Sequence, residues 1–261
     1  MENNKILVDC YFEYFSNIHQ KAKNDLKKNA PQILEGVKNF YGSIGQEYGL
    51  KGVDIDFKIH DNPMENHKEL NKNHLALIFT DKDFIFQKYS IEDIVKGLYP
   101  EDYDKAIKSI YGAIDEEAEK LNSIYSKFSV NSAKPSSEKI NLAARNLYTN
   151  RFKLKFYKCI ITAEGMALRG LNTIHIYYPV DYIPTPFNIF NNFQGSNSEC
   201  LHTCKHELGH MLGLEHVNSN TNLMRVAGNF FKDTMYYVQK MSVKKNELTY
   251  DQVLTITNHF S

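Results

Sequence analysis

The sequence predicts an α+β fold in a single domain that covers residues 1–261. Three short segments before residue 81 are rich in β-branched and aromatic side chains, which is typical of strands. Two longer segments, at residues 31–48 and 101–129, instead repeat apolar residues with the helical period. Because 42% of the residues are hydrophobic, the chain can bury a substantial core. We therefore expect a twisted, mixed sheet packed against helices.

The N-terminal part of the chain is expected to supply three strands and one helix. The first strand is predicted at residues 5–15. The second, residues 53–59, alternates strictly between apolar and polar residues, so its apolar residues are expected to point inward. The third, residues 74–80, is almost wholly apolar, as in a strand buried on both faces. Between the first two strands, Pro31 is expected to open a helix that Gly49 ends.

The middle of the chain is predicted to be mainly helical. Residues 101–129 form a long amphipathic helix, and the Ser- and Pro-containing residues 131–137 form a loop. A shorter helix is expected to follow at residues 140–147. Two further strands are then predicted, at residues 153–161 and 171–178.

The sequence HELGHMLGLEH, which begins at His206, carries the strongest chemical signal. Residues four apart on a helix share a face, so His206 and His210 are expected to point at a common centre. Glu207 can reach the same pocket without taking a ligand position. Gly213 allows a left-handed turn, after which the chain can double back and deliver His216. Three neutral imidazoles and one open position are the ligand set of a catalytic zinc ion.

This pattern, H-E-x-x-H-x-x-G-x-x-H, resembles the motif of the metzincin clan of zinc endopeptidases. Met224, in the sequence Asn222-Leu223-Met224, fits the methionine beneath the zinc in the clan's Met-turn. The resemblance implies a zincin-like fold, with an upper subdomain over the active-site helix to about residue 213. A small helical lower subdomain would occupy residues 214–261, and the helices around residues 95–150 would be an insertion.

The resemblance also implies the chemistry of the site. His206, His210 and His216 would bind Zn²⁺, and Glu207 would act as the general base of a metalloendopeptidase. The protein or peptide substrate would bind as an extended strand along the sheet edge. By position that edge falls on residues 171–178, although an ordinary core strand explains the same residues equally well.

Three alternatives compete with this assignment. A catalytically inactive, zinc-containing binding protein would have the same fold, but it would have no need of the carboxylate of Glu207. A zinc peptidase with a glutamate as third ligand would have to use Glu247, which lies at the entry of a predicted helix. His202 has ligand spacing to His206, but Thr203 follows it where a base is needed, so we expect it to be packed or solvated.

Other histidines and the branch of the clan give weaker signals. The histidines outside this stretch, among them His60 and His74, are scattered along the sequence, so they are expected to be unpaired surface or core residues. Val217 follows the third histidine, where branches of the clan carry Asp, Ser, Glu or Pro, so the branch stays unassigned.

The local signals around the motif predict its supports. Capping boxes are expected at Ser196, for the active-site helix, and at Thr249, for a C-terminal helix. Residues 225–245 would carry the wall of the pocket for the first residue after the scissile bond. Cys200 and Cys204 lie one helical turn apart, a poor geometry for a disulfide. Cys10 and Cys159 lie in strand-like segments and could pair, but a buried free thiol is the expected state of all four cysteines.

Charge and hydropathy narrow the range of partners. Lys plus Arg and Asp plus Glu both number 31, which favours neither nucleic acid nor an acidic membrane surface. We therefore expect the protein to bind neither nucleic acid nor a membrane, and to be a monomer.

The N-terminal segment bears on localisation. Asp9 and Glu13 interrupt its first apolar run, unlike a signal peptide. This predicts a cytoplasmic protein if the chain is full length and a secreted one if it is a mature fragment.

Overall fold

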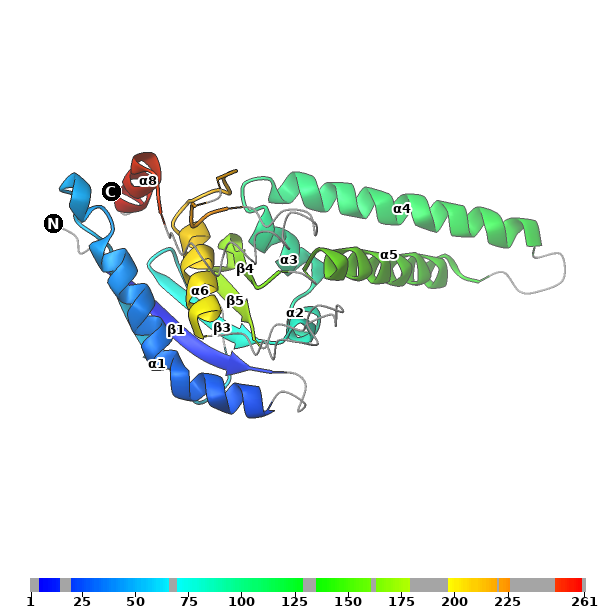
Figure 1. Ribbon diagram of the computed structural model, residues 1–261. Helices are drawn as coiled ribbons and strands as arrows, with labels where there is room; N and C mark the ends of the chain where they lie inside the picture. Colours follow the sequence, from blue (N-terminus) through cyan, green and yellow to red (C-terminus); the bar gives the residue numbers. More distant parts are fainter. Residues whose placement is uncertain are drawn as a thin grey trace, which may run out of the picture. The chain divides into compact units, whose positions relative to one another are not determined.

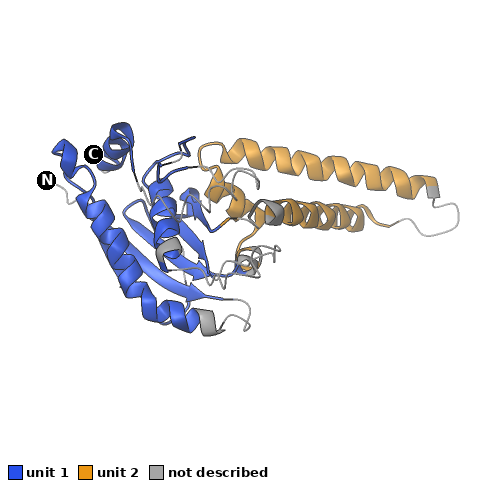
Figure 2. Ribbon diagram, in the orientation of Figure 1, with its two compact units in different colours: residues 1–84, 164–261 blue, residues 85–163 orange. Residues whose placement is uncertain are grey.

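The computed structural model describes residues 5–14, 20–65, 70–128, 135–160, 163–178, 197–219, 221–225 and 247–259. The chain divides into two compact units (Figure 2). Unit 1 comprises Met1–Phe84 and Glu164–Ser261, and unit 2 comprises Ile85–Ala163. Unit 1 holds the sheet and the histidine motif, whereas unit 2 is helical.

Unit 1 is built on a five-stranded sheet in the order β2-β1-β3-β5-β4 (Figure 1). The strands are β1 (Lys5–Glu13), β2 (Asp54–Ile59), β3 (His74–Thr80), β4 (Gly165–Leu168) and β5 (Thr173–Tyr177). The pairs among β2, β1, β3 and β5 are parallel, and β4 is antiparallel to β5. The fold is thus mixed α/β with a mostly parallel sheet, which is compatible with the predicted α+β class.

The first three predicted strands are confirmed. Residues 171–178 were expected to be either the edge of the sheet or an ordinary core strand, and the edge assignment is wrong. β5 pairs with β3 on one side and with β4 on the other, so it is an interior strand rather than the sheet edge. Among the described strands, β4 lies at the edge beyond it. Four residues are too few to show an alternating pattern, which explains why the sequence did not reveal β4.

One face of the sheet packs on α1 (Gln20–Ser43) and α6 (Asn197–Met211) in a shared core. The alternation in β1 buries Ile6 and Val8 completely against these helices. The prediction that Pro31 opens α1 is wrong, since the helix begins at Gln20 and contains the proline. Leu26 and Ala30 are fully buried, so the apolar stripe of α1 extends through the turns before Pro31 and packing outweighs the cost of the proline.

Two short segments complete the described part of the early chain. The 3₁₀ turn η2 (Gln46–Tyr48) follows α1 and ends at Gly49, which has a φ of 70°. α2 (Lys82–Lys88) follows β3. Phe84 from α2 packs with Met64, Ala76 and Ile78 in a second small core.

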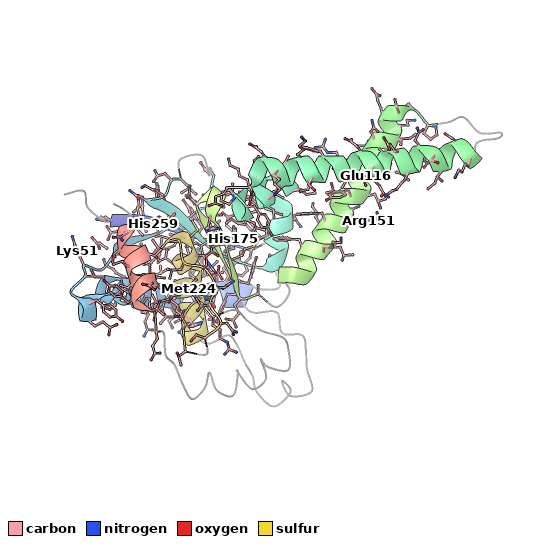
Figure 3. The ribbon with its side chains drawn as sticks, turned by 90° about the horizontal axis from the view of Figure 1, so that it is seen from above. Lys51, Glu116, Arg151, His175, Met224 and His259 are labelled. Carbon is pink, nitrogen blue, oxygen red and sulfur yellow. The ribbon has the colours of Figure 1, made fainter. Side chains whose placement is uncertain are left out.

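Unit 2 consists mainly of α3 (Ile91–Leu98), α4 (Tyr103–Phe128) and α5 (Ser137–Ile160). α4 and α5 pack side by side, and Arg151 of α5 forms an ion pair with Glu117 of α4 at 3.3 Å (Arg151 is labelled in Figure 3). The strand predicted at residues 153–161 is wrong, because α5 continues through Ile160. The alternation of Phe152, Leu154 and Phe156 imitates a strand, but Leu154 is exposed and the segment continues a helix that packs on α4.

The end of the described chain is α8 (Tyr250–Asn258), and its predicted capping box at Thr249 is confirmed. The capping box predicted at Ser196 lies outside the described residues, as does the predicted pocket wall at residues 225–245 apart from Arg225. Among the described helices, none combines the length and apolar character needed to cross a lipid bilayer.

Candidate metal centre

α6 places the first two histidines because its opposite side is anchored in the core. Cys204, Leu208 and Leu212 are at most 1% exposed, which fixes the rotation of the helix. His206 and His210 then lie on the partly exposed face, one turn apart. Gly209 allows the close approach beneath them, because a Cβ there would lie 2.7 Å from Sδ of Met224.

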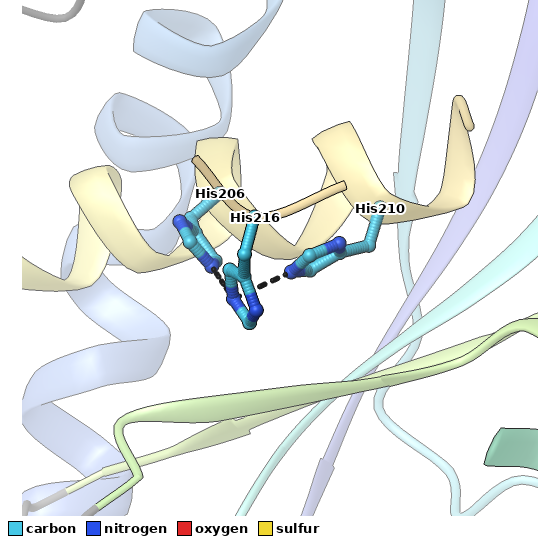
Figure 4. Close-up of side chains that lie close together, drawn as sticks. All are labelled: His206, His210 and His216. Atoms are coloured by element: carbon cyan, nitrogen blue, oxygen red, sulfur yellow. Dashed lines mark hydrogen bonds between the residues drawn. The ribbon is translucent and has the colours of Figure 1, made fainter. Parts of the chain in front are cut away.

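The third histidine arrives after a tight reversal of the chain. Gly213 has a φ of 89°, the left-handed conformation that its place in the motif predicts. The backbone N–H of Leu214 donates to the carbonyl of Gly209 at 2.9 Å, which ends the helix and turns the chain. His216 follows this turn and faces the other two imidazoles (Figure 4).

The three imidazoles converge through their Nε2 atoms. Nε2 of His216 lies 3.1 Å from Nε2 of His206 and 3.1 Å from Nε2 of His210. The three candidate ligand atoms lie within 4.8 Å of one another, and they form the one group of this kind in the described ranges. Three nitrogens bound to one tetrahedral zinc ion at about 2.05 Å would lie about 3.3 Å apart. The two distances to Nε2 of His216 are therefore close to those expected around a single ion.

Backbone carbonyls fix the tautomers of the two helical histidines. Nδ1 of His206 lies 2.8 Å from the carbonyl oxygen of Leu223, and Nδ1 of His210 lies 2.8 Å from that of Leu214. Since a carbonyl only accepts, each Nδ1 carries the proton and each Nε2 presents a lone pair. These lone pairs face the third Nε2, an arrangement that a cation among them stabilises.

Burial keeps all three imidazoles in the neutral form that binds metal. It lowers the pKa of His206 to about 3, against the opposing effect of the Leu223 carbonyl. Burial also lowers the pKa of His210 and of His216. A ligand set that is neutral at ordinary pH has no proton to lose when a metal ion binds.

Glu207 is buried behind the histidines at 7% exposure. Burial raises the pKa of its carboxyl to about 8, while a hydrogen bond from the backbone of Ala167 acts in the opposite direction. A nearby dication would favour the ionised form. Burial and a bound metal ion would thus shift the pKa of Glu207 in opposite directions.

The predicted Met-turn lies directly below the cluster. Met224 is fully buried (labelled in Figure 3), and its carbonyl accepts a hydrogen bond from Val217, the residue after the third histidine, at 2.8 Å. The carbonyl of Leu223 holds His206, as described above. Residues 223 and 224 therefore support two of the three ligand-bearing segments through their backbone.

The structure separates the remaining candidates from the cluster. Glu247 and His202 do not belong to the three-residue group among the described residues. Glu215 is 74% exposed and forms an ion pair with Arg169 at 3.0 Å, so it binds an arginine rather than a metal. Cys10, Cys200 and Cys204 are confirmed as buried free thiols, and the side chain of Cys159 lies outside the description.

Two features of unit 1 were not predicted. His60 and His74 were expected to be unpaired, but both bind Asp9, with Nε2 to carboxylate oxygen distances of 2.7 Å. The amide of Ala167, which lies on the unrecognised strand β4, binds Glu207. Both contacts join residues far apart in sequence, and only the order of the strands brings them together.

No family model, curated protein or solved structure matches this chain. What is known of the site therefore comes from the residues of this chain. They establish a mixed α/β unit with a mostly parallel five-stranded sheet, and a group of three histidines that could hold a metal ion.

Proposed function

We propose that this protein is a metzincin-like zinc endopeptidase. The observation that carries the proposal is the convergence of three imidazole Nε2 atoms beside a buried glutamate in the following position of the same helix. A purely structural zinc site is usually closed by four protein ligands. Three ligands and an adjacent carboxylate instead match the composition of a hydrolytic centre.

His206, His210 and His216 would hold the metal ion. When bound, Zn²⁺ would polarise the scissile carbonyl and lower the pKa of a water molecule in the open position. Glu207 would accept the proton of that water and transfer it to the leaving amine. The amide of Ala167 would orient the carboxylate of Glu207 between these two roles.

The edge strand β4 is the proposed binding site for an extended peptide. In the described part of the sheet β4 pairs with β5 on one side, so its other side can accept a further strand. β4 also lies against the proposed base: a Cβ on Gly165 would meet Cγ of Glu207 at 2.7 Å. A substrate strand added to β4 would therefore run close to Glu207 and the three histidines.

Glu207→Gln tests this function because it removes the base and keeps the shape of the side chain. Cleavage of an unfolded protein by the zinc-loaded variant should fall by at least about 100-fold, with one equivalent of zinc retained. Glu215→Gln is the matched control, since that carboxylate lies beside His216 but is exposed. It should retain cleavage within a few-fold.

Three results would separate the possible outcomes. Cleavage that survives both Glu207→Gln and a chelator would contradict the proposal. Stoichiometric zinc with no cleavage of any peptide in a broad library would favour the inactive binding protein instead. Loss of cleavage on chelation, with recovery on addition of zinc, would support the endopeptidase.

A further inference from the structure

A pair of buried amides joins α8 to the Met-turn. Nδ2 of Asn222 donates to Oε1 of Gln252 at 2.7 Å, and Nε2 of Gln252 donates to Oδ1 of Asn222 at 3.3 Å. Asn222 is 7% exposed and Gln252 is 9% exposed. Since buried amides without partners are costly, each side chain stabilises the position of the other.

Asn222 uses the same side chain to shape the turn. Its Oδ1 also accepts from the backbone N–H of Met224 at 2.8 Å, across two residues. The N–H of Leu223 between them donates to the carbonyl of Glu247 at 3.0 Å. The conformation of residues 222–224 therefore depends on the side chain of Asn222 and on the segment that leads into α8.

The turn at residues 222–224 supports two of the proposed ligands. The carbonyl of Leu223 accepts from Nδ1 of His206 at 2.8 Å. The carbonyl of Met224 accepts from the N–H of Val217, next to His216, at 2.8 Å. A shift of the turn would move both carbonyls together, and with them one ligand of α6 and the ligand beyond Gly213.

We propose that Gln252 is a positioning residue of the metal centre, acting through Asn222 and the Met-turn on His206 and His216. The inference rests on the proposed metal centre and adds to it a support from the C-terminal helix. Gln252 suits this role because its Oε1 also accepts from the N–H of Thr249 at 3.0 Å, in the capping box of α8. One side chain thus ties the start of α8 to the turn beneath the histidines.

The test compares two variants that both damage the cap of α8. One of them also loses the contact between Gln252 and Asn222, and the other keeps it. Gln252→Leu removes both functions, whereas Thr249→Ala removes the hydroxyl that caps α8 and leaves the Asn222 contact in place. Gln252→Glu keeps an acceptor for Asn222 and Thr249 but lacks the donor. Zinc affinity is measured with a competing chromophoric chelator, and ligand geometry from the visible spectrum of the Co²⁺ form.

Gln252→Leu should weaken zinc binding roughly tenfold, the lower end of the effects of residues that support metal ligands. Its Co²⁺ spectrum should lose intensity relative to the unaltered protein. Thr249→Ala should bind zinc as tightly as the unaltered protein even if it unfolds at a similarly lower temperature. The zinc affinity of Gln252→Glu should lie between those of the other two variants. This variant provides the measurement if Gln252→Leu does not fold.

Equal zinc affinity in all three variants would overturn the inference while leaving the metal centre intact. Equal weakening in Thr249→Ala and Gln252→Leu would also overturn it, because the effect would then come from the stability of α8. Failure of the unaltered protein to bind one equivalent of zinc or Co²⁺ would instead reject the proposed function itself. The two failures are therefore distinguishable in one series of measurements.

Discussion

Unit 1 contains two groups of histidines, and they differ in what faces the imidazole nitrogens. In the Asp9 cluster, formed by Asp9, His60 and His74, each imidazole Nε2 lies 2.7 Å from a different oxygen of one carboxylate. In the metal cluster, formed by His206, His210 and His216, three Nε2 atoms face one another without an acid among them. One cluster has a carboxylate between its imidazoles, and the other has a space between three nitrogens that could hold a metal ion.

The two clusters also differ in the secondary structure that holds their histidines. The Asp9 cluster joins neighbouring strands: Asp9 lies on β1, His74 on β3, and His60 directly after β2. The ring of Tyr11 also stacks on His60 with a centroid distance of 4.8 Å. The metal cluster requires a helix, a left-handed turn and two backbone carbonyls that fix the tautomers. Histidine content alone therefore does not identify a metal site; the groups that occupy the second nitrogen and the space between the rings do.

The largest expected effect on zinc affinity comes from removing one imidazole of the metal cluster, and the matched control removes one imidazole of the Asp9 cluster. His210→Ala should weaken zinc binding by more than about 100-fold, beyond the loss expected for a supporting residue, because a ligand itself disappears. His74→Ala should leave the zinc stoichiometry and affinity unchanged. Equilibrium dialysis and chelator competition measure both. Loss of zinc in His74→Ala would break the distinction between the clusters.

Low pH should weaken the contribution of the Asp9 cluster to folding stability, because it protonates the carboxylate of Asp9. Burial tends to raise the pKa of Asp9, but the hydrogen bonds and charges of His60 and His74 outweigh it and hold the pKa below its usual range. A folded-state pKa below the unfolded one adds stability above about pH 4, and this stability is lost as the pH falls through the folded-state pKa. Asp9→Asn should cost about 2 kcal/mol at pH 7, as for hydrogen bonds to a charged group.

The check is chemical denaturation of Asp9→Asn and of the unaltered protein between pH 2 and pH 7. The difference in unfolding free energy should begin to shrink below about pH 4 and should disappear only once the pH has fallen below the folded-state pKa of Asp9, where its carboxyl is protonated in both states. A difference that stays constant across this range would show that the carboxylate charge is not what stabilises the cluster. Zinc affinity at pH 7 should be the same for both proteins.

Gly213→Ala should have the smallest effect on stability. The φ of 89° is unfavourable for alanine by about 1 kcal/mol. The added Cβ would meet Cγ2 of Thr255 at 3.6 Å, an ordinary contact, so backbone strain alone sets the cost. Unfolding should therefore occur at slightly lower denaturant concentration, with one equivalent of zinc still bound. A loss of several kcal/mol would mean that the turn needs more than a left-handed residue.

The sequence predicts the convergence of the three histidines better than the sheet around them, for a physical reason. His206, Gly213 and His216 are close in sequence, so helix geometry and one left-handed turn are enough to bring the imidazoles together. The edge strand β4 and the cluster around Asp9 depend on which strands become neighbours, and local patterns do not contain that information. Long-range order thus accounts for the wrong edge assignment and for the missed Asp9 pairs.

The errors in the helices have a different origin. Pro31 and the alternation after Arg151 are local signals that usually end or exclude a helix. In α1, the burial of Leu26 and Ala30 against the sheet outweighs the proline. In α5, the residues after Arg151 continue a helix that begins at Ser137 and contains neither glycine nor proline. Tertiary packing decides the first case and the continuity of a long helix decides the second, so a window of a dozen residues gives the wrong result in both.

The insertion of unit 2 into unit 1 has a consequence for folding order. Phe79 of β3 must pair in register with Ile176 of β5, and the whole of Ile85–Ala163 lies between them in the chain. Closing so long a loop carries an entropy cost, whereas the antiparallel helices α4 and α5 form from nearer contacts. Early formation of the helical hairpin would shorten the effective loop and speed the docking of β5, the strand that carries β4 to the sheet.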